Sequence, residues 1–179
     1  MAPAGRRGDI LPDRLADNLA VWFVGTAAGP ASAAAGAYYA HPGNRFWRTL
    51  HETGITPRLL APHQYGELLW LGIGLTDICK TRWGVDADIP PHAFDPHRLR
   101  AKVRRLRPQT IAFTSKKAAS LWLRRDTNQI GTGRQPPEDG RPLVFVLPSP
   151  SGLATSYWSI EPWRDLAGHL ASRRPAKGS

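Results

Sequence analysis

The chain has 179 residues, with 24 Lys or Arg against 14 Asp or Glu, so its formal net charge is +10. This length suits a single domain, and a hydrophobic fraction of 41% argues against a disordered chain. The single Cys excludes an internal disulfide, and no apolar run reaches the roughly 20 residues of a membrane helix.

The N-terminus lacks an apolar signal-peptide region, so we expect a cytoplasmic protein, associated with the nucleoid of a bacterial cell. The positive charge indicates a polyanionic partner, most simply nucleic acid. One domain should span residues 1–179, with short flexible ends at about 1–8 and 173–179.

Short apolar runs alternate with helical patterns along the chain. The runs predict four buried strands, at residues 19–24, 71–78, 110–114 and 143–147. The helical patterns lie at residues 44–53, 62–70, 96–106, 116–123 and 161–172, with Asp95 and Ser115 as N-caps of the third and fourth. Residues 81–91 and 127–142 are polar and rich in Gly or Pro, which is typical of loops. The alternation predicts an α/β fold with a parallel sheet.

The most basic segment falls on the predicted helix at residues 96–106. Leu99, Val103 and Leu106 recur at helical spacing and predict a buried stripe. The cations around them form either a solvated face or a surface that attracts phosphate, and the pattern leaves both interpretations open.

In an open parallel sheet, ligands bind beyond the carboxyl ends of the strands. Small and hydroxyl-bearing residues follow each predicted strand, and Asp77 follows the second. We therefore expect a cleft at this edge that admits a flat ligand or a phosphate backbone.

Four motifs at these loops occur in the order of a known family. They are residues 24–29 (VGTAAG), 38–47 (YYAHPGNRFW), 72–77 (GIGLTD) and 146–153 (VLPSPSGL). With them, residues 9–172 resemble the mismatch-specific uracil and thymine DNA glycosylases, family two of the uracil-DNA glycosylase superfamily. Residues 39–47 are also similar to the hypoxanthine-DNA glycosylases.

The resemblance implies a three-layer α/β/α sandwich with a four-stranded parallel sheet. It implies a monomeric enzyme that flips a uracil or a mismatched base out of double-stranded DNA and hydrolyses its N-glycosidic bond. No cofactor, metal, membrane or obligatory protein partner is implied.

The resemblance also assigns roles to individual residues. Tyr39 would stack on the flipped base, unless it is an ordinary core Tyr, and Leu153 would wedge into the duplex, unless it caps a turn. The remaining candidate contacts are to the base at Thr26, Ala27, His41 and Ser149, and to DNA at Ser151 and Gly152. Arg45 would bind phosphate or hold the pocket loop, and Lys116, at the start of a predicted helix, would lie near a DNA phosphate or in solvent.

One position departs from the family pattern. The family places water with the Asn of Gly-Ile-Asn-Pro-Gly, and here that position is Ala27, whose methyl group cannot hold water. Asp77 is the best candidate for a relocated catalytic group, followed by Asn44 and His41. Alternatively, Asp77 caps a loop, Asn44 caps a helix, and the protein binds lesions with little or no cleavage. A general basic nucleic-acid protein and a hypoxanthine-specific glycosylase also remain open, as does the identity of the base removed.

Overall fold

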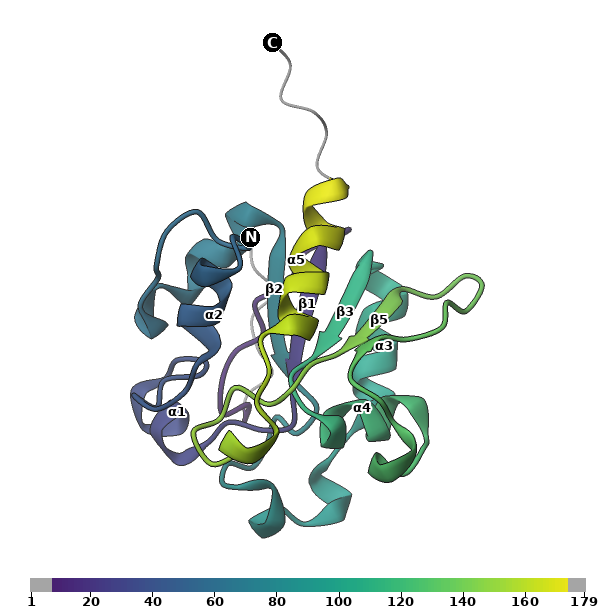
Figure 1. The fold of residues 1–179 in the computed structure, drawn as a ribbon. Coiled ribbons are helices and arrows are strands. Elements are labelled where there is room, and N and C mark those ends of the chain that lie inside the picture. Colours follow the sequence, from purple (N-terminus) through teal and green to yellow (C-terminus); the bar gives the residue numbers. More distant parts are fainter. Residues whose placement is uncertain (1–7, 174–179) are drawn as a thin grey trace.

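The computed structural model describes residues 8–173, and the expected flexible ends fall almost wholly outside this range. One sheet with the strand order β2-β1-β3-β5-β4 runs through the molecule, and helices cover both of its faces (Figure 1). The predicted α/β/α sandwich is therefore confirmed.

The four predicted strands are present and parallel. They are β1 (Val21–Gly25), β2 (Ile73–Asp77), β3 (Thr110–Phe113) and β5 (Leu143–Val146). A fifth strand, β4 (Gly133–Arg134), pairs antiparallel with β5 inside the segment predicted to be only a loop. Two residues carry no periodic signal, and β4 exists because the free edge of β5 offers it hydrogen-bond partners. The sheet is thus mixed rather than purely parallel.

Alternate residues of β1 supply the two halves of the core. Val21 and Phe23 face a cluster that includes α2 (Phe46–Glu52) and α5 (Glu161–Ser172). Trp22 and Val24 face the opposite cluster, built on α3 (Pro96–Leu106) and α4 (Lys116–Leu123). Because every β1 residue is buried, the strand reads as a continuous apolar run.

The predicted and observed starts of α3 and α4 agree, and both helices have a side-chain N-cap. Asp95 accepts the backbone N–H of Arg98 at 2.9 Å, and Ser115 accepts that of Ala118 at 3.1 Å, so α3 and α4 begin where predicted. The helix expected over 62–70 is a 3-10 helix, η1 (Pro62–Leu71), and α1 (Pro30–Ala35) was not predicted because its Ala-rich sequence has no apolar stripe. Short 3-10 turns punctuate the loops, at η2 (Asp86–Asp88), η3 (Pro91–Ala93), η4 (Thr127–Gln129) and η5 (Thr155–Tyr157).

Two of the cations of helix α3 form ion pairs within the molecule. Leu99, Val103 and Leu106 form the predicted buried stripe. Arg98 pairs with Asp9, and Lys102 pairs with Asp13. Part of the basic segment is therefore neither a free solvated face nor available to phosphate.

The tryptophans differ widely in burial. Trp22 and Trp163 are fully buried, but Trp70 is 91% exposed at the end of the 3-10 helix η1. Trp83, in the polar loop over residues 81–91, is 55% exposed. Within residues 8–173, no helix is long and apolar enough to span a membrane.

Candidate active site

Three polar side chains converge on Gly25, the last residue of β1. A β-carbon at Gly25 would lie 2.6 Å from Oδ1 of Asp77, 3.4 Å from Oη of Tyr39 and 3.6 Å from Oγ1 of Thr114. Strand register explains the meeting, because Gly25 pairs with Asp77 across the β1–β2 ladder and Thr114 follows β3. Only Gly leaves room for the carboxylate, so this edge of the sheet holds the expected polar cluster.

Asp77 is a buried carboxylate with no hydrogen bond to its oxygens from any residue of the described range, and it is 6% exposed. Burial raises its pKa from 3.8 to about 6, an effect that the charge of Lys80 opposes. A carboxylate with free lone pairs and a pKa below neutral can accept a proton from water or stabilise a cation. Loop capping, the alternative interpretation of Asp77, is not what its side chain does.

Tyr39 lies on the other side of Gly25's polar cluster and packs against α2. Its ring stacks on Phe46 with centroids 3.9 Å apart, and its hydroxyl shares a hydrogen bond of 3.0 Å with Thr114. Burial, reinforced by the charge of Asp77, raises the pKa of Tyr39 far above its ordinary value, so the hydroxyl stays protonated. Phe46 covers one face of the ring, and a stacked base would therefore need the other.

The loops after β1 and β2 run side by side and are joined by hydrogen bonds. Cys79 N–H donates to Thr26 O at 2.7 Å, and Gly84 N–H donates to Ala28 O at 2.9 Å. The hydroxyl of Thr26 donates to Asp86 at 2.6 Å. Ala27 packs against the apolar cluster under α3 and α4, so no polar side chain from this loop replaces the family Asn.

Asn44 and His41, the other candidate catalytic residues, are engaged in local structure. The Asn44 side chain accepts the N–H of Phe46 at 2.9 Å and so shapes the start of α2, although the N-cap position itself is Arg45. Nδ1 of His41 accepts the N–H of Gly43 at 2.9 Å, and His41 is exposed. Of the three candidates, only Asp77 has free acceptor atoms in the polar cluster at Gly25.

The predicted wedge loop is shaped by its own serines. Ser149 accepts the N–H of Ser151 at 3.3 Å, and Ser151 accepts that of Leu153 at 3.2 Å. Leu153 is 84% exposed, so it projects outward as expected of a wedge. Gly152 passes so close to Gly43 that a β-carbon added to Gly152 would lie 3.1 Å from the carbonyl oxygen of Gly43.

Arg45 joins this loop to the Tyr39 segment. Its N–H donates to Pro150 O at 2.8 Å, and its guanidinium reaches Ser151 O at 3.4 Å. The guanidinium also lies 5.1 Å from the centre of the Trp158 ring. Arg45 therefore holds the loop in place through these contacts. Lys116, the other predicted cationic DNA contact, lies at the start of α4 and is exposed.

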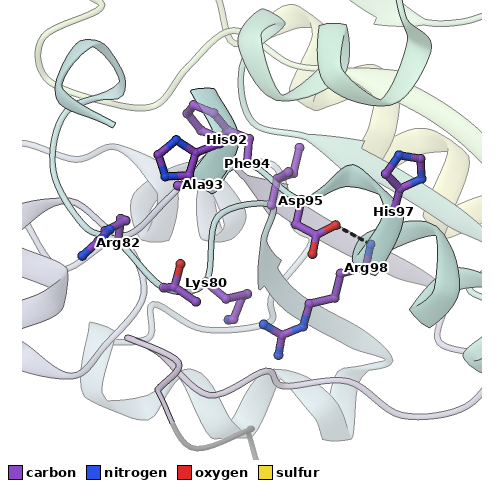
Figure 2. Close-up of a pocket in the computed structure, with 10 residues that line it drawn as sticks. Lys80, Arg82, His92, Ala93, Phe94, Asp95, His97 and Arg98 are labelled. Atoms are coloured by element: carbon purple, nitrogen blue, oxygen red, sulfur yellow. Dashed lines mark hydrogen bonds between the residues drawn. The ribbon is translucent and has the colours of Figure 1, made fainter. Parts of the chain in front are cut away.

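A cavity of about 490 Å³ opens beside the end of β2 (Figure 2). It begins at Ile78 and Lys80, just past Asp77 in the chain. Cationic or titratable side chains dominate its wall, and the lining residues are Ile78, Lys80, Thr81, Arg82, His92, Ala93, Phe94, Asp95, His97 and Arg98. Such a wall favours an anionic group over an apolar one. Among residues 8–173, no group of His, Cys, Asp or Glu could hold a metal ion.

The model of the Uracil DNA glycosylase superfamily matches residues 12–167. The chain belongs to this superfamily. A similar solved structure is the solution NMR structure of a "putative Uracil DNA glycosylase" from Methanosarcina acetivorans, at 21% identity and a TM-score of 0.64, covering 90% of this chain and 96% of that one. This likeness shows that the two chains share a fold.

Sequence reasoning passed over several residues that shape this superfamily member's polar cluster. The sequence identified Thr114 only as one of several hydroxyl-bearing residues after a strand, and Phe46 only as part of a predicted helix. Asp13 and Lys80 bond to each other across 67 residues of chain, a pairing that no local pattern signals. The sequence pointed to Asp77 because this residue follows the second predicted strand, and the structure places it opposite Gly25.

Proposed function

We propose that the chain is a DNA glycosylase that removes a uracil or a mismatched, deaminated base from double-stranded DNA and leaves an abasic site. Membership of the superfamily supports action on DNA. The observation that carries the proposal is the Asp77 carboxylate, which is buried beside Gly25 and has both oxygens free of hydrogen bonds within residues 8–173.

In the proposed reaction, the target nucleotide is flipped out and its base enters the cluster at Gly25, against the free face of Tyr39. As the glycosidic bond breaks, its electron pair leaves with the base and the sugar gains oxocarbenium character. The Asp77 carboxylate stabilises this cation and accepts a proton from the water that attacks the sugar carbon. Backbone N–H groups near Thr26 and Tyr39 bind the edge of the departing base.

The DNA itself would be held by the exposed loops around the cluster. Leu153 would fill the gap left by the extruded base, and Ser151 and Gly152 would lie against the backbone. Lys116, at the exposed start of α4, would meet a phosphate. We propose that one copy of the chain acts alone, in the cytoplasm.

Ala27 favours a second candidate function. Because a methyl group stands where the family pattern has a water-binding Asn, a protein that binds mismatches or lesions without cleaving them would carry this residue too. The similarity of residues 39–47 to hypoxanthine-DNA glycosylases adds hypoxanthine to the candidate bases.

The test is a cleavage panel. Purified protein is incubated with duplexes that contain G:U, G:T or a hypoxanthine pair, and abasic sites are converted to strand breaks with alkali. We expect breaks at one or more of these bases and none in the undamaged control duplex. Intact strands throughout, combined with retention of the mismatched duplex in a binding assay, would favour the non-cleaving binder. Equal retention of matched and mismatched duplexes would indicate a general nucleic-acid protein. An Ala27→Asn variant should gain uracil excision if the alignment of the first motif is correct.

A further inference from the structure

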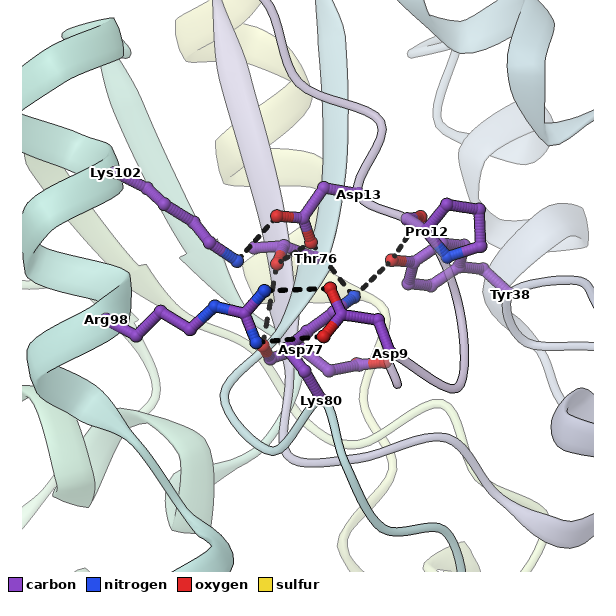
Figure 3. A network of polar contacts seen from close by, with 9 residues as sticks. All are labelled: Asp9, Pro12, Asp13, Tyr38, Thr76, Asp77, Lys80, Arg98 and Lys102. Carbon is purple, nitrogen blue, oxygen red and sulfur yellow. Dashed lines mark hydrogen bonds and ion pairs between the residues drawn. The ribbon is translucent and has the colours of Figure 1, made fainter. Parts of the chain in front are cut away.

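A buried cluster of charges lies beside Asp77 (Figure 3). Asp13, on the segment that precedes β1, binds Nζ of Lys80 at 2.9 Å and Nζ of Lys102 at 2.5 Å. The hydroxyl of Thr76, the neighbour of Asp77 on β2, donates to the same carboxylate at 2.7 Å. The three charged side chains are 2% to 12% exposed, so their charges are largely withheld from water.

The charges of this cluster do not balance without Asp77. Lys80 and Lys102 contribute two positive charges, and Asp13 supplies one negative charge. An uncompensated charge in a protein interior is costly. The ionised carboxylate of Asp77 offsets this excess positive charge, but burial disfavours the ionised form more strongly, so the pKa of Asp77 stays above its ordinary value.

Lys80 supplies this compensation without occupying the Asp77 oxygens. Its ammonium group is directed to Asp13 at 2.9 Å and to the hydroxyl of Tyr38 at 3.1 Å. The Tyr38 hydroxyl in turn donates to Pro12 O at 3.0 Å, which holds its oxygen in place as the acceptor for Lys80. The positive charge is therefore held near Asp77 by bonds to other groups, and the carboxylate keeps its lone pairs for substrate.

We propose that Lys80 is a positioning residue that, held by Asp13 and Tyr38, keeps Asp77 ionised and free of hydrogen bonds for catalysis. This inference rests on the proposed function, because it gives Asp77 its role there. It adds a residue outside the four family-like motifs and couples the segment before β1 to the reaction.

The surroundings of Asp77 support this assignment. Burial raises the pKa of its carboxyl, and the charge of Lys80 is the strongest influence in the opposite direction. Several charged or titratable groups act on Asp77 from the elements packed around it: Asp13 before β1, Tyr39 after α1, Lys80 after β2, Asp86 in η2 and Lys102 in α3. Of these, the two lysines favour the ionised form, and Asp13 and Asp86 oppose it.

The neighbouring ion pair of Asp9 and Arg98 provides a matched control. Two hydrogen bonds of 2.9 Å and 2.8 Å join the guanidinium of Arg98 to the Asp9 carboxylate, so this pair is balanced by itself. Arg98 lies on α3 one turn from Lys102, and it is not among the leading influences on the pKa of Asp77, although its charge interacts with Asp13 and Lys102. An Arg98→Met variant thus removes a partly exposed cation of α3 whose hydrogen bonds go to Asp9 and not to Asp13.

The deciding experiment is an NMR titration of the Asp77 side-chain carboxyl carbon in the full-length protein. The wild-type midpoint is expected at about 6. In Lys80→Met it should rise by about one pH unit or more, and in Lys80→Arg it should stay near the wild-type value. Lys102→Met should raise it by less, which keeps the test available if Lys80→Met does not fold. An unchanged midpoint in the Lys80→Met or Lys102→Met protein, or an equal rise in Arg98→Met, overturns the proposal.

Excision rates provide the functional readout. In single-turnover assays, Lys80→Met should move the acid limb of the pH–rate profile upward by the shift seen in the titration, with the plateau at high pH retained. A loss by the same factor at every pH would mean that Lys80 is merely structural, and would overturn the positioning role. The titration needs no DNA, so a wild-type protein that cleaves nothing would reject the proposed function, and the midpoints would still decide the charge coupling.

Discussion

The polar cluster at Gly25 and the wedge loop at residues 149–157 are built in opposite ways. Long-range strand register assembles the cluster, since Gly25, Asp77 and Thr114 come from three different strand ends. The loop is shaped by serines two residues apart, and it presents Leu153 and Tyr157 almost fully to solvent. Under the proposed function, the chemistry would depend on a buried interior that strand register assembles, whereas contact with the duplex would depend on an exposed local turn.

The largest expected effect comes from Asp77→Asn. The amide cannot accept a proton from water, so the single-turnover excision rate should fall by about 10²- to 10⁴-fold. Binding of a mismatched duplex, measured by fluorescence anisotropy, should change little because the loop is untouched. A variant with unchanged turnover would remove Asp77 from the mechanism.

Stability separates this loss of rate from unfolding. Between pH 3.8 and about 6 the folded carboxyl holds a proton that the unfolded chain has lost, so stability falls as the pH rises and the penalty is complete above 6. Asp77→Asn removes the buried charge, and its free energy of unfolding above pH 6 should rise by about 3 kcal/mol, since the pKa of Asp77 is raised from 3.8 to about 6. Urea unfolding of both proteins above and below this range checks the sign, and a less stable variant above pH 6 would contradict it.

Gly25→Ala should cause the next largest loss of excision rate. The new β-carbon would stand 2.6 Å from Oδ1 of Asp77, which forces the carboxylate to move. A displacement of about 1 Å can cost about 10²-fold in rate, and we expect such a loss with duplex binding retained. Gly66→Ala is the control, because nothing lies within 4 Å of its added carbon. If both variants kept the wild-type rate, the close approach at Gly25 would be irrelevant to catalysis.

Leu153→Ala tests the other region. If Leu153 fills the space of an extruded base, truncation should lower excision from a paired duplex by about tenfold, the value of a few buried methylene groups. Excision from single-stranded DNA, which needs no wedge, should stay constant. Leu59→Ala serves as the comparison, since Leu59 is also exposed, at 54%, but lies just before η1. Equal losses on paired and single-stranded substrates would refute the wedge.

The smallest effect should come from the outer charge of α3. Arg104 and Arg105 are exposed and form no ion pair with a residue of the described range, unlike Arg98 and Lys102. Replacing both with Gln should weaken binding to all DNA and make its salt dependence less steep, by up to about 0.9 for each phosphate that the protein no longer neutralises. The ranking of bases in the cleavage panel should not change, and a changed ranking would show that α3 takes part in base selection.

Much of the fold could be predicted because its signals are local. Apolar runs placed the four parallel strands, and the caps at Asp95 and Ser115 placed α3 and α4. The signals were absent for α1, which is nearly all small residues, and for β4, which exists only through pairing with β5. The helix expected over 62–70 is the 3-10 helix η1, because apolar spacing over so few residues cannot distinguish the two helix types.

The candidate site divides in the same way. Asp77 was accessible to sequence reasoning, since it ends a strand at the ligand-binding edge of the sheet. Its supporting groups were not, because Asp13, Lys80 and Lys102 meet only after the sheet and α3 have packed. Local hydrogen bonds of Asn44 and His41 were equally invisible, and they leave these residues less suited to catalysis than Asp77.

The central claim is that an ionised Asp77 performs the chemistry, and the wild-type pH–rate profile tests it most directly. Burial raises the pKa of Asp77 to about 6, so the single-turnover excision rate on a cleaved substrate should be constant above this pH. Below it, the rate should fall tenfold per pH unit as the carboxyl becomes protonated. In Asp77→Asn, the residual rate should show no such limb. A wild-type rate that stays constant well below pH 6, or a limb that persists in Asp77→Asn, would contradict the account.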